Sequence, residues 1–271
     1  MKIFKNKLIL QKEIYKDNCL SFVPTMGGLH KGHLSLIQKA KKKKCKVCVS
    51  IFVNPKQFDK KRDFKNYPRN LNSDIKKLKK LKIDYLYLPT YSDIFSFKTK
   101  SKIYLDAFSK QLCGKFRKGH FEGVLNIVNR FLEIIKPKYI FLGIKDFQQL
   151  ILITHHIKKN KIKTKVVECK TIRDKNGVAC STRNFNLNNR QLIIASNIYK
   201  YLFNLNKKIK INYKFFQLKD IKKKLFSLGA TKIDYIENLK LKNLHKTIKS
   251  KNKYKLFFAY YINDIRLIDN I

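Results

Sequence analysis

Two histidines next to a glycine-containing loop are the first residues whose spacing points to chemistry. His30 and His33 stand three positions apart, with Gly32 between them. Side chains with this spacing at the start of a helix share one face, beside backbone N–H groups without partners in the helix. Gly32 leaves room for a phosphate. The arrangement predicts an anion site for nucleotidyl transfer, where donors aimed at the attacked phosphoryl group lower the barrier. Histidines that only cap a helix are the alternative.

The residues around this pair predict the elements that must position it. Residues 20–24 form a short apolar run closed by proline, residues 25–28 form the loop, and apolar residues recur with helical spacing over 34–40. A strand that leads through a glycine loop into a helix is the opening unit of a nucleotide-binding α/β sheet.

Strands and helices alternate through the rest of the N-terminal part. Further strands are expected at 47–53, 83–88, 139–142 and 164–169, and helices at 70–82, 124–135 and 146–157. This alternation predicts an α/β fold with a Rossmann-like, doubly wound parallel sheet over residues 1–171. Residues 172–271 are expected to form a smaller C-terminal α+β domain that acts as a lid. Its helical patterns lie at about 188–206 and 215–228, and its strand-like segments near 232–237 and 255–262.

Further blocks resemble, in order along the chain, those of the pantothenate synthetase (pantoate–β-alanine ligase) family of HxGH nucleotidyltransferases. The blocks are Val49–Phe58, Tyr67–Arg69 with Asp74, Gly114–Gly123, Phe141–Leu150, Arg173–Asn184 and Arg266–Asn270. One block alone carries little weight, but the ordered set is specific. The resemblance implies ATP-dependent condensation of (R)-pantoate with β-alanine through a pantoyl adenylate, giving pantothenate, AMP and pyrophosphate. The attacking carboxylate is already ionised at neutral pH, so the first step needs positioning and charge stabilisation rather than a base.

The resemblance also implies roles for single residues. His30 and His33 contact the ATP phosphates, with His33 the better candidate for proton donation, and Asp146 binds the ribose hydroxyls. Catalytic roles fall to His30, His33, Lys145, Ser181, Thr182 and Arg183. The implied ATP-binding set is Met26, Gly27, Gly28, Leu29, His30, Lys31, Gly32, His33, Gly143, Ile144, Lys145, Asp146, Ile172, Cys180, Ser181, Thr182 and Arg183.

The substrate and metal sites are implied in the same way. Gln57 and Gln149 hold the hydroxyls and carboxylate of pantoate, because an amide both donates and accepts. The full substrate-binding set is Asn54, Gln57, Arg117, His120 and Gln149, and Asp74 assists Mg²⁺. The sequence departs from the usual family pattern at Ser73, Lys118, Ile144, Cys180 and Thr182. Ser73 leaves fewer carboxylates near the metal, whereas Thr182 keeps a hydroxyl.

The charge of the chain raises a different class of function. Lys and Arg number 62 against 18 Asp and Glu, a formal net charge of +44, which by itself points to nucleic acid or an anionic membrane surface. The lysines are spread along every segment, however, and no block interleaves surface aromatics with cations as RNA readers do. We therefore expect compositional drift and no specific nucleic-acid partner. A basic RNA-binding module on a degenerate transferase fold stays open, as does another HxGH nucleotidyltransferase.

Cysteine usage and hydropathy bear on the compartment. The six cysteines show no framework spacing, and the lone Cys45 and Cys48 pair lacks the second pair of a zinc site. We expect reduced thiols and a cytoplasmic enzyme. No segment reaches the length of a membrane span, and the N-terminus has no apolar leader. The resemblance further implies a homodimer.

Overall fold

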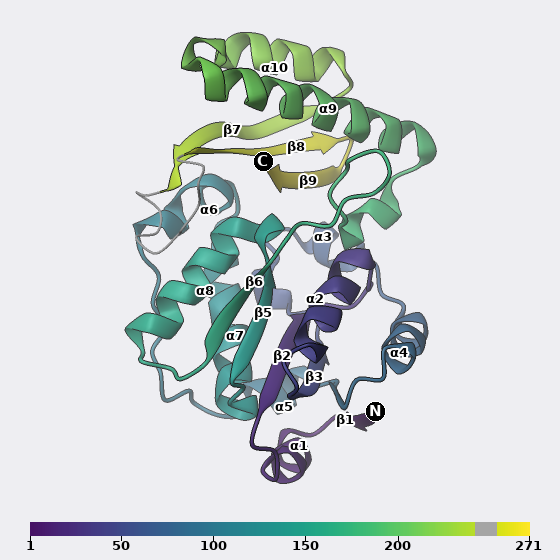
Figure 1. Ribbon diagram of the computed structural model, residues 1–271, viewed down its shortest axis with the longest axis vertical. Coiled ribbons are helices and arrows are strands. Elements are labelled where there is room, and N and C mark those ends of the chain that lie inside the picture. The colour runs from purple at the N-terminus through teal and green to yellow at the C-terminus, as the bar shows by residue number, and fades with distance from the viewer. Residues whose placement is uncertain (242–253) are drawn as a thin grey trace. The chain divides into compact units, whose positions relative to one another are not determined.

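The computed structural model describes residues 1–241 and 254–271, which divide into two compact units, Met1–Thr171 and Ile172–Ile271 (Figure 1). The N-terminal unit contains a six-stranded sheet in the order β1-β4-β3-β2-β5-β6, and every neighbouring pair is parallel. The strands are β1 (Lys2–Phe4), β2 (Leu20–Thr25), β3 (Lys46–Ile51), β4 (Tyr85–Tyr87), β5 (Tyr139–Gly143) and β6 (Lys165–Cys169). The predicted doubly wound parallel sheet is confirmed. The strand order reverses between β2 and β5, the point where such sheets bind ligands.

Helices cover both faces of this sheet. The α-helices of the unit are α1 (Lys7–Ile14), α2 (Lys31–Lys41), α3 (Lys61–Lys65), α4 (Leu71–Lys80), α5 (Tyr91–Phe95), α6 (Leu112–Phe116), α7 (His120–Ile135) and α8 (Phe147–Lys159). Short 3₁₀ helices are η1 (Pro55–Gln57), η2 (Ala107–Lys110) and η3 (Ile144–Asp146). Neighbouring strand residues point to opposite faces, so Phe22 packs with α7 and α8 while Val23 packs with α2 and α4. The two apolar layers fix the carboxyl ends of β2 and β5 from both sides.

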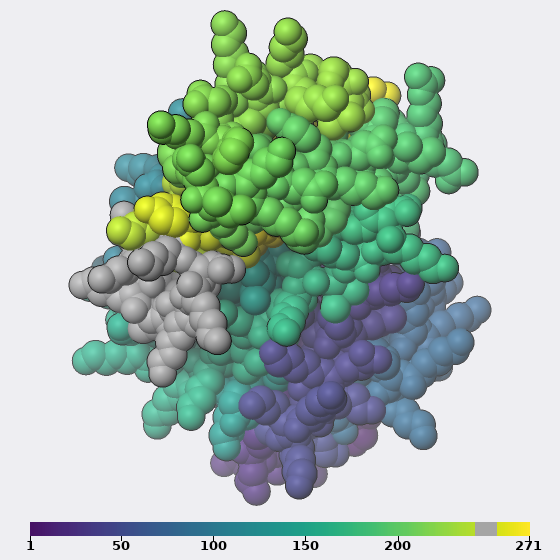
Figure 2. Space-filling view, turned by 45° about the horizontal axis from the view of Figure 1, so that its top comes forward, coloured from purple at the N-terminus to yellow at the C-terminus, as the bar shows by residue number. Residues whose placement is uncertain are grey.

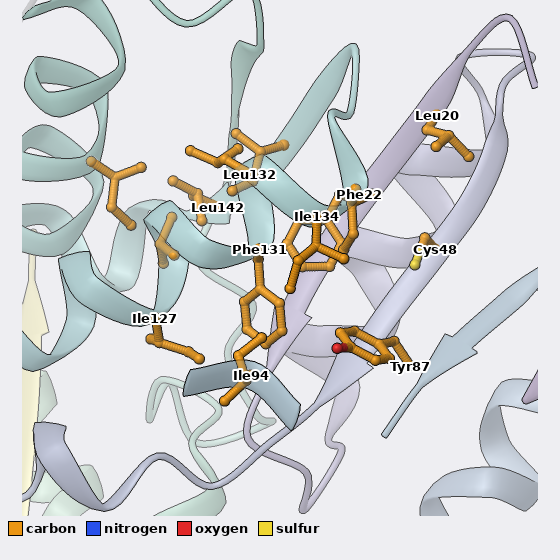
Figure 3. Close-up of a cluster of buried hydrophobic side chains, with 14 of the residues drawn as sticks. Leu20, Phe22, Cys48, Tyr87, Ile94, Ile127, Phe131, Leu132, Ile134 and Leu142 are labelled. Carbon is orange, nitrogen blue, oxygen red and sulfur yellow. The ribbon is translucent and has the colours of Figure 1, made fainter. Parts of the chain in front are cut away.

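The apolar layer between the sheet and α7 and α8 contains a group of three aromatic rings. Phe131 of α7 lies between Phe22 of β2 and Tyr87 of β4, with ring centroids 5.4 and 6.1 Å away in edge-on geometry (Figure 3). Such contacts stabilise by about 0.5–1.5 kcal/mol each beyond the burial of their apolar area. They anchor α7, whose N-terminal turn reaches the candidate site.

The C-terminal unit has a separate core. Its antiparallel sheet has the order β7-β8-β9, formed by β7 (Lys232–Lys240), β8 (Tyr254–Ile262) and β9 (Ile265–Asn270). The helices α9 (Asn189–Ile211) and α10 (Leu218–Ser227) pack against it, with η4 (Thr182–Asn186) and η5 (Tyr213–Phe215) in the connections. Long side chains extend from the outer surface of these two helices in Figure 2. The predicted small α+β arrangement is confirmed.

One expectation about the cysteines is wrong. Cys19 and Cys45 are joined by a disulfide, with their Cα atoms 5.0 Å apart. Each residue directly precedes a strand, and these strands, β2 and β3, are parallel neighbours, so the pair falls within bridging distance. Four cysteines are free: Cys48, Cys113, Cys169 and Cys180. Over residues 1–241 and 254–271, no helix is both long enough and apolar enough to span a membrane.

Candidate active site

The glycine loop is fixed to the end of β3. Gly27 and Gly28 have φ values of +78° and +60°, which only glycine adopts at little cost. The Thr25 hydroxyl donates to the Ser50 carbonyl at 2.7 Å and accepts from the Gly27 N–H at 3.2 Å. The backbone between β2 and α2 therefore has a single defined path.

His30 and His33 do cap α2, each through its Nδ1. The Nδ1 of His30 accepts from the Gly32 N–H at 3.1 Å, and the Nδ1 of His33 accepts from the His30 N–H at 3.5 Å. Because Nδ1 accepts in both rings, each neutral ring carries its proton on Nε2. The capping alternative and the phosphate role are thus compatible, since the Nε2–H groups are donors.

Both histidines are neutral at pH 7. Burial, followed by the charge of Lys145, lowers the pKa of His30 to about 4. Burial, followed by the nearby His30 and then Lys145, lowers the pKa of His33 well below its ordinary value. The rings therefore offer uncharged hydrogen-bond donors, and the positive charge of the site comes from lysines.

Lys145 reaches this site from the neighbouring strand. It lies in η3, directly after β5, and β5 pairs in parallel with β2. Its Nζ lies 3.5 Å from Oδ1 of Asp146. The segments 25–33 and 143–146 thus come together at the carboxyl ends of adjacent strands, which groups the expected ATP residues of the N-terminal unit.

Gln57 and Asn54 follow β3. The Gln57 side chain is almost buried, and its Nε2 lies 2.8 Å from Sδ of Met26, so it points toward the glycine loop. Asn54 is fully buried, donates to the Gly123 carbonyl at 3.0 Å and accepts from the Lys56 N–H at 3.2 Å. Asn54 therefore joins η1 to α7, whereas the contact of Gln57 with pantoate stays a prediction.

Arg117 and His120 gather around the backbone of Gln57. Arg117 is buried, its Nε donates to Asp59 at 2.8 Å, and its Nη2 donates to the Gln57 carbonyl at 3.2 Å. The His120 Nδ1 lies 2.7 Å from the same carbonyl, and its Nε2 lies 3.0 Å from Nη1 of Arg117. Burial would raise the pKa of Asp59, but the hydrogen bond and charge of Arg117 lower it overall. The structure thus gives both residues a bracing role; direct contact with substrate stays a prediction.

The second glutamine of the expected pantoate pair sits beside a structural one. Gln148 is buried, accepts from the Cys113 N–H at 3.0 Å and donates to the carbonyls of Phe108 and Gln111. Gln149 follows it in the first turn of α8 and is half-buried. Gln148 therefore ties the first turn of α8 to the backbone of residues 108–113, and the pantoate contact of Gln149 stays a prediction.

Asp74 has a different environment from the one expected of a metal ligand. It is 1% exposed, and its two carboxylate oxygens accept from the N–H groups of Gly28 and Leu29, both at 2.8 Å. Across residues 1–241 and 254–271, no group of three or more His, Cys, Asp or Glu side chains is placed to hold a metal ion. The residues present thus do not fit a protein-built Mg²⁺ site at Asp74.

The remaining expected residues lie in the C-terminal unit. Ser181 caps η4 by accepting from the Arg183 N–H at 3.3 Å, and Thr182 is buried. The Cys180 N–H donates to the Ile172 carbonyl at 2.9 Å. The five residues thus lie on a short hairpin over 172–180 and on the helix η4 that follows it, and their approach to ATP stays a prediction.

Some residues of the site were not found from sequence. Asp59 follows the predicted Gln57 block by one position, and Lys77 lies one helical turn after Asp74, so spacing alone was a usable signal for both. Thr25 and Gly123 lie within the expected loop and the block Gly114–Gly123, but their contacts were not predicted, because their partners, Ser50 and the η1 backbone, lie in other parts of the chain.

Comparisons with known proteins agree with the geometry. The family profile described as pantoate-beta-alanine ligase matches residues 2–271. A pantothenate synthetase of Flavobacterium psychrophilum is 40% identical over 270 residues, covering 98% of this chain and 95% of that protein. A crystal structure of the Francisella tularensis pantoate-beta-alanine ligase, complexed with beta-gamma ATP and beta-alanine, aligns with a TM-score of 0.85 at 37% identity, over 100% of this chain and 97% of that one. The crystal structure of the Thermus thermophilus pantothenate synthetase aligns with a TM-score of 0.90 at 26% identity, over 100% of this chain and 99% of that one. The chain belongs to the pantoate–β-alanine ligase family.

Proposed function

We propose that this enzyme condenses (R)-pantoate with β-alanine, using ATP, to give pantothenate, AMP and pyrophosphate. The observation that carries the proposal is the pair of Nε2–H donors of His30 and His33 at the carboxyl end of β2, beside Lys145, in a chain matched by the family over residues 2–271. The related Francisella ligase was crystallised with a form of ATP and with β-alanine.

The first step forms a bond between a pantoate carboxylate oxygen and the α-phosphorus of ATP and breaks the bond to the β-phosphate oxygen. The two imidazoles donate hydrogen bonds to phosphate oxygens, and Lys145 balances their growing negative charge. In the second step the neutral amine of β-alanine attacks the acyl carbon, AMP leaves with the bonding electrons, and the nitrogen loses a proton. Gln57 and Gln149 hold pantoate in this scheme.

The C-terminal segment would complete the phosphate site. Ser181, Thr182 and Arg183 are proposed to donate to the triphosphate, with the C-terminal unit serving as a lid. The 3₁₀ helix η4, which Ser181 caps and in which Thr182 and Arg183 come first, supports this role, because it holds all three residues on one short segment.

The compartment and assembly are also proposals. We propose a cytoplasmic homodimer that binds no specific nucleic acid. The disulfide between Cys19 and Cys45 bears on the compartment, because the cytoplasm keeps most thiols reduced. Alkylation of freshly lysed cells followed by mass measurement of the protein tests this, since a bridged pair resists modification; complete protection of the pair would count against the cytoplasmic proposal.

The test of the reaction is pantothenate formation, followed by mass spectrometry, from pantoate, β-alanine and Mg·ATP. Pyrophosphate release with pantoate is compared with release in the presence of nicotinate mononucleotide. Release that depends on pantoate, and pantothenate that appears only when β-alanine is added, supports the proposal. Release with the mononucleotide alone would identify another nucleotidyltransferase. Absence of turnover together with salt-resistant, sequence-preferring RNA binding would favour the RNA-binding alternative.

A further inference from the structure

We propose that Asp74 is a positioning residue that holds the glycine loop in its ATP-binding shape, and that it does not ligate Mg²⁺. The inference rests on the proposed use of this loop for ATP. It concerns the segment from Thr25 to Leu29, which leads directly into the two catalytic histidines.

The first observation is the pairing of one carboxylate with two consecutive amides. Asp74 Oδ2 accepts from the Gly28 N–H and Oδ1 from the Leu29 N–H, each at 2.8 Å, and the side chain is 1% exposed. A buried carboxylate without partners is strongly unfavourable, and backbone N–H donors are the groups that offset its desolvation. Each oxygen therefore accepts one N–H of the loop, and the carboxylate is buried against it.

The second observation is the close packing of the loop on this carboxylate. A Cβ added at Gly27 would lie 3.1 Å from Oδ2 of Asp74 and 3.1 Å from Cγ2 of Ile51. The glycine thus lets the backbone approach Asp74 while it keeps its positive φ. A metal ion and its waters would have to displace this contact.

The third observation is that α4 holds Leu29 by both of its backbone groups, and thus two successive peptides. Lys77, one turn after Asp74, donates from Nζ to the Leu29 carbonyl at 2.7 Å. The N–H and C=O of Leu29 are thus both bonded to side chains of one helix. This arrangement orients the peptide that precedes His30, and so fixes the start of α2.

The chemistry of the carboxylate decides between the two roles. A metal ligand acts only when the metal is present, whereas a loop-holding residue acts on nucleotide binding without any metal. Asn at position 74 keeps the size of the side chain, but its NH₂ group would face one of the two loop N–H groups. One donor would then be left without an acceptor, and the loop would shift.

The test uses the full-length protein and Asp74→Asn. Binding of metal-free ATP, in EDTA, is measured by calorimetry, and the Mg²⁺ concentration for half-maximal activity is measured separately. We expect metal-free ATP to bind about tenfold more weakly to the variant, the effect of one lost charge-assisted hydrogen bond, with an unchanged Mg²⁺ requirement. Unchanged metal-free binding would overturn the proposal, whether or not the Mg²⁺ requirement rises.

The matched control is Asp84→Asn. Asp84 accepts from the Val47 N–H at 2.8 Å, at the start of β3 and thus at the opposite end of the sheet from the loop. It loses the same type of hydrogen bond, so nucleotide binding should stay as in the wild type even if the melting temperature falls. Wild-type protein that fails to bind ATP would count against the proposed function itself, a result distinct from failure of this inference.

A second measurement needs no variant. In the wild-type protein without nucleotide, the amide signals of Gly28 and Leu29 should show slow hydrogen exchange and should not broaden when Mn²⁺ is added. Fast exchange, or selective broadening by Mn²⁺ at these two amides, would overturn the proposal even if Asp74→Asn did not fold.

Discussion

The imidazole rings of His30 and His33 lie with their centroids 4.1 Å apart, and each ring accepts a backbone N–H on its Nδ1. The helix cap therefore fixes the tautomer of both rings and turns their Nε2–H groups into oriented donors. Second partners that set the orientation of a histidine are a common way to prepare it for a ligand.

Replacing either histidine should affect the chemical step. We expect His33→Ala and His30→Ala each to lower kcat for pantothenate formation by about 10²–10³, the usual effect of removing one donor to a charged transition state. Steady-state rates with saturating substrates measure this. His155→Gln is a suitable control, because His155 contacts Asp106 near the far end of α8. A loss of activity in the control equal to that of the two variants would contradict the assignment.

The buried histidines should make folding stability depend on pH. The pKa of His30 is about 4 in the folded protein and near 6.5 in the unfolded chain. Below pH 6.5 the unfolded state binds protons that the folded state does not, so stability is full above pH 6.5 and falls as pH drops toward 4. We expect His30 alone to contribute a loss of about 2–3 kcal/mol over this window.

Urea unfolding of the wild type and of His30→Gln, at several pH values between 7.5 and 4.5, measures this difference. Glutamine does not titrate, so the curve of free energy against pH should be flatter for the variant. Parallel curves for the two proteins would show that His30 does not carry the effect.

Gly123 should control the position of Gln57. A Cβ at Gly123 would lie 2.2 Å from the Lys56 carbonyl oxygen and 2.7 Å from the Gln57 nitrogen. Alanine favours a helix by about 1 kcal/mol over glycine, but this backbone clash outweighs that gain. We expect Gly123→Ala to raise the KM for pantoate by about tenfold or more, because a shift of the group that holds a substrate weakens binding at that level. The exposed Glu122 supplies the control Glu122→Ala, for which KM should not change.

The brace formed by Arg117 should tolerate no lysine. A lysine has no planar fork and cannot reach Asp59, His120 and the Gln57 carbonyl together. Arg117→Lys is expected to lower the free energy of unfolding by about 2–4 kcal/mol, since it disrupts a buried pair. Chemical denaturation measures this, and a change below about 0.5 kcal/mol, the size of a typical surface substitution, would contradict the bracing role.

The sequence allowed the sheet to be predicted because its central strands are apolar runs with clear ends. Residues 20–24 and 139–142 end at proline or glycine and became β2 and β5. The short β1 and helix α1 were missed, since charged residues interrupt their apolar pattern. Helix α7 starts at His120, whereas the prediction began at 124. Its first turn contains His120, Glu122 and Gly123 and shows little apolar periodicity, so the sequence did not reveal this turn as helical.

The candidate site was predictable where one motif contains all of its residues. The histidine pair was singled out by its local spacing, and Lys145 by the resemblance of its block, Phe141–Leu150. The role of Asp74 could not be found in this way, because its partners lie 46 and 45 positions earlier in the chain and are backbone groups without a residue signature. The bracing of Gln57 by Arg117 was hidden for the same reason, with the two residues 60 positions apart.

The bond between Cys19 and Cys45 closes a ring with a sequence separation of 26, and this ring contains the whole of β2, the glycine loop, both histidines and α2. While the bond is intact, a protease that cuts once inside the ring cannot separate the two fragments. A nicked chain would therefore keep His30 and His33 covalently attached to the rest of the sheet, and would release the cut piece only after a thiol reductant is added.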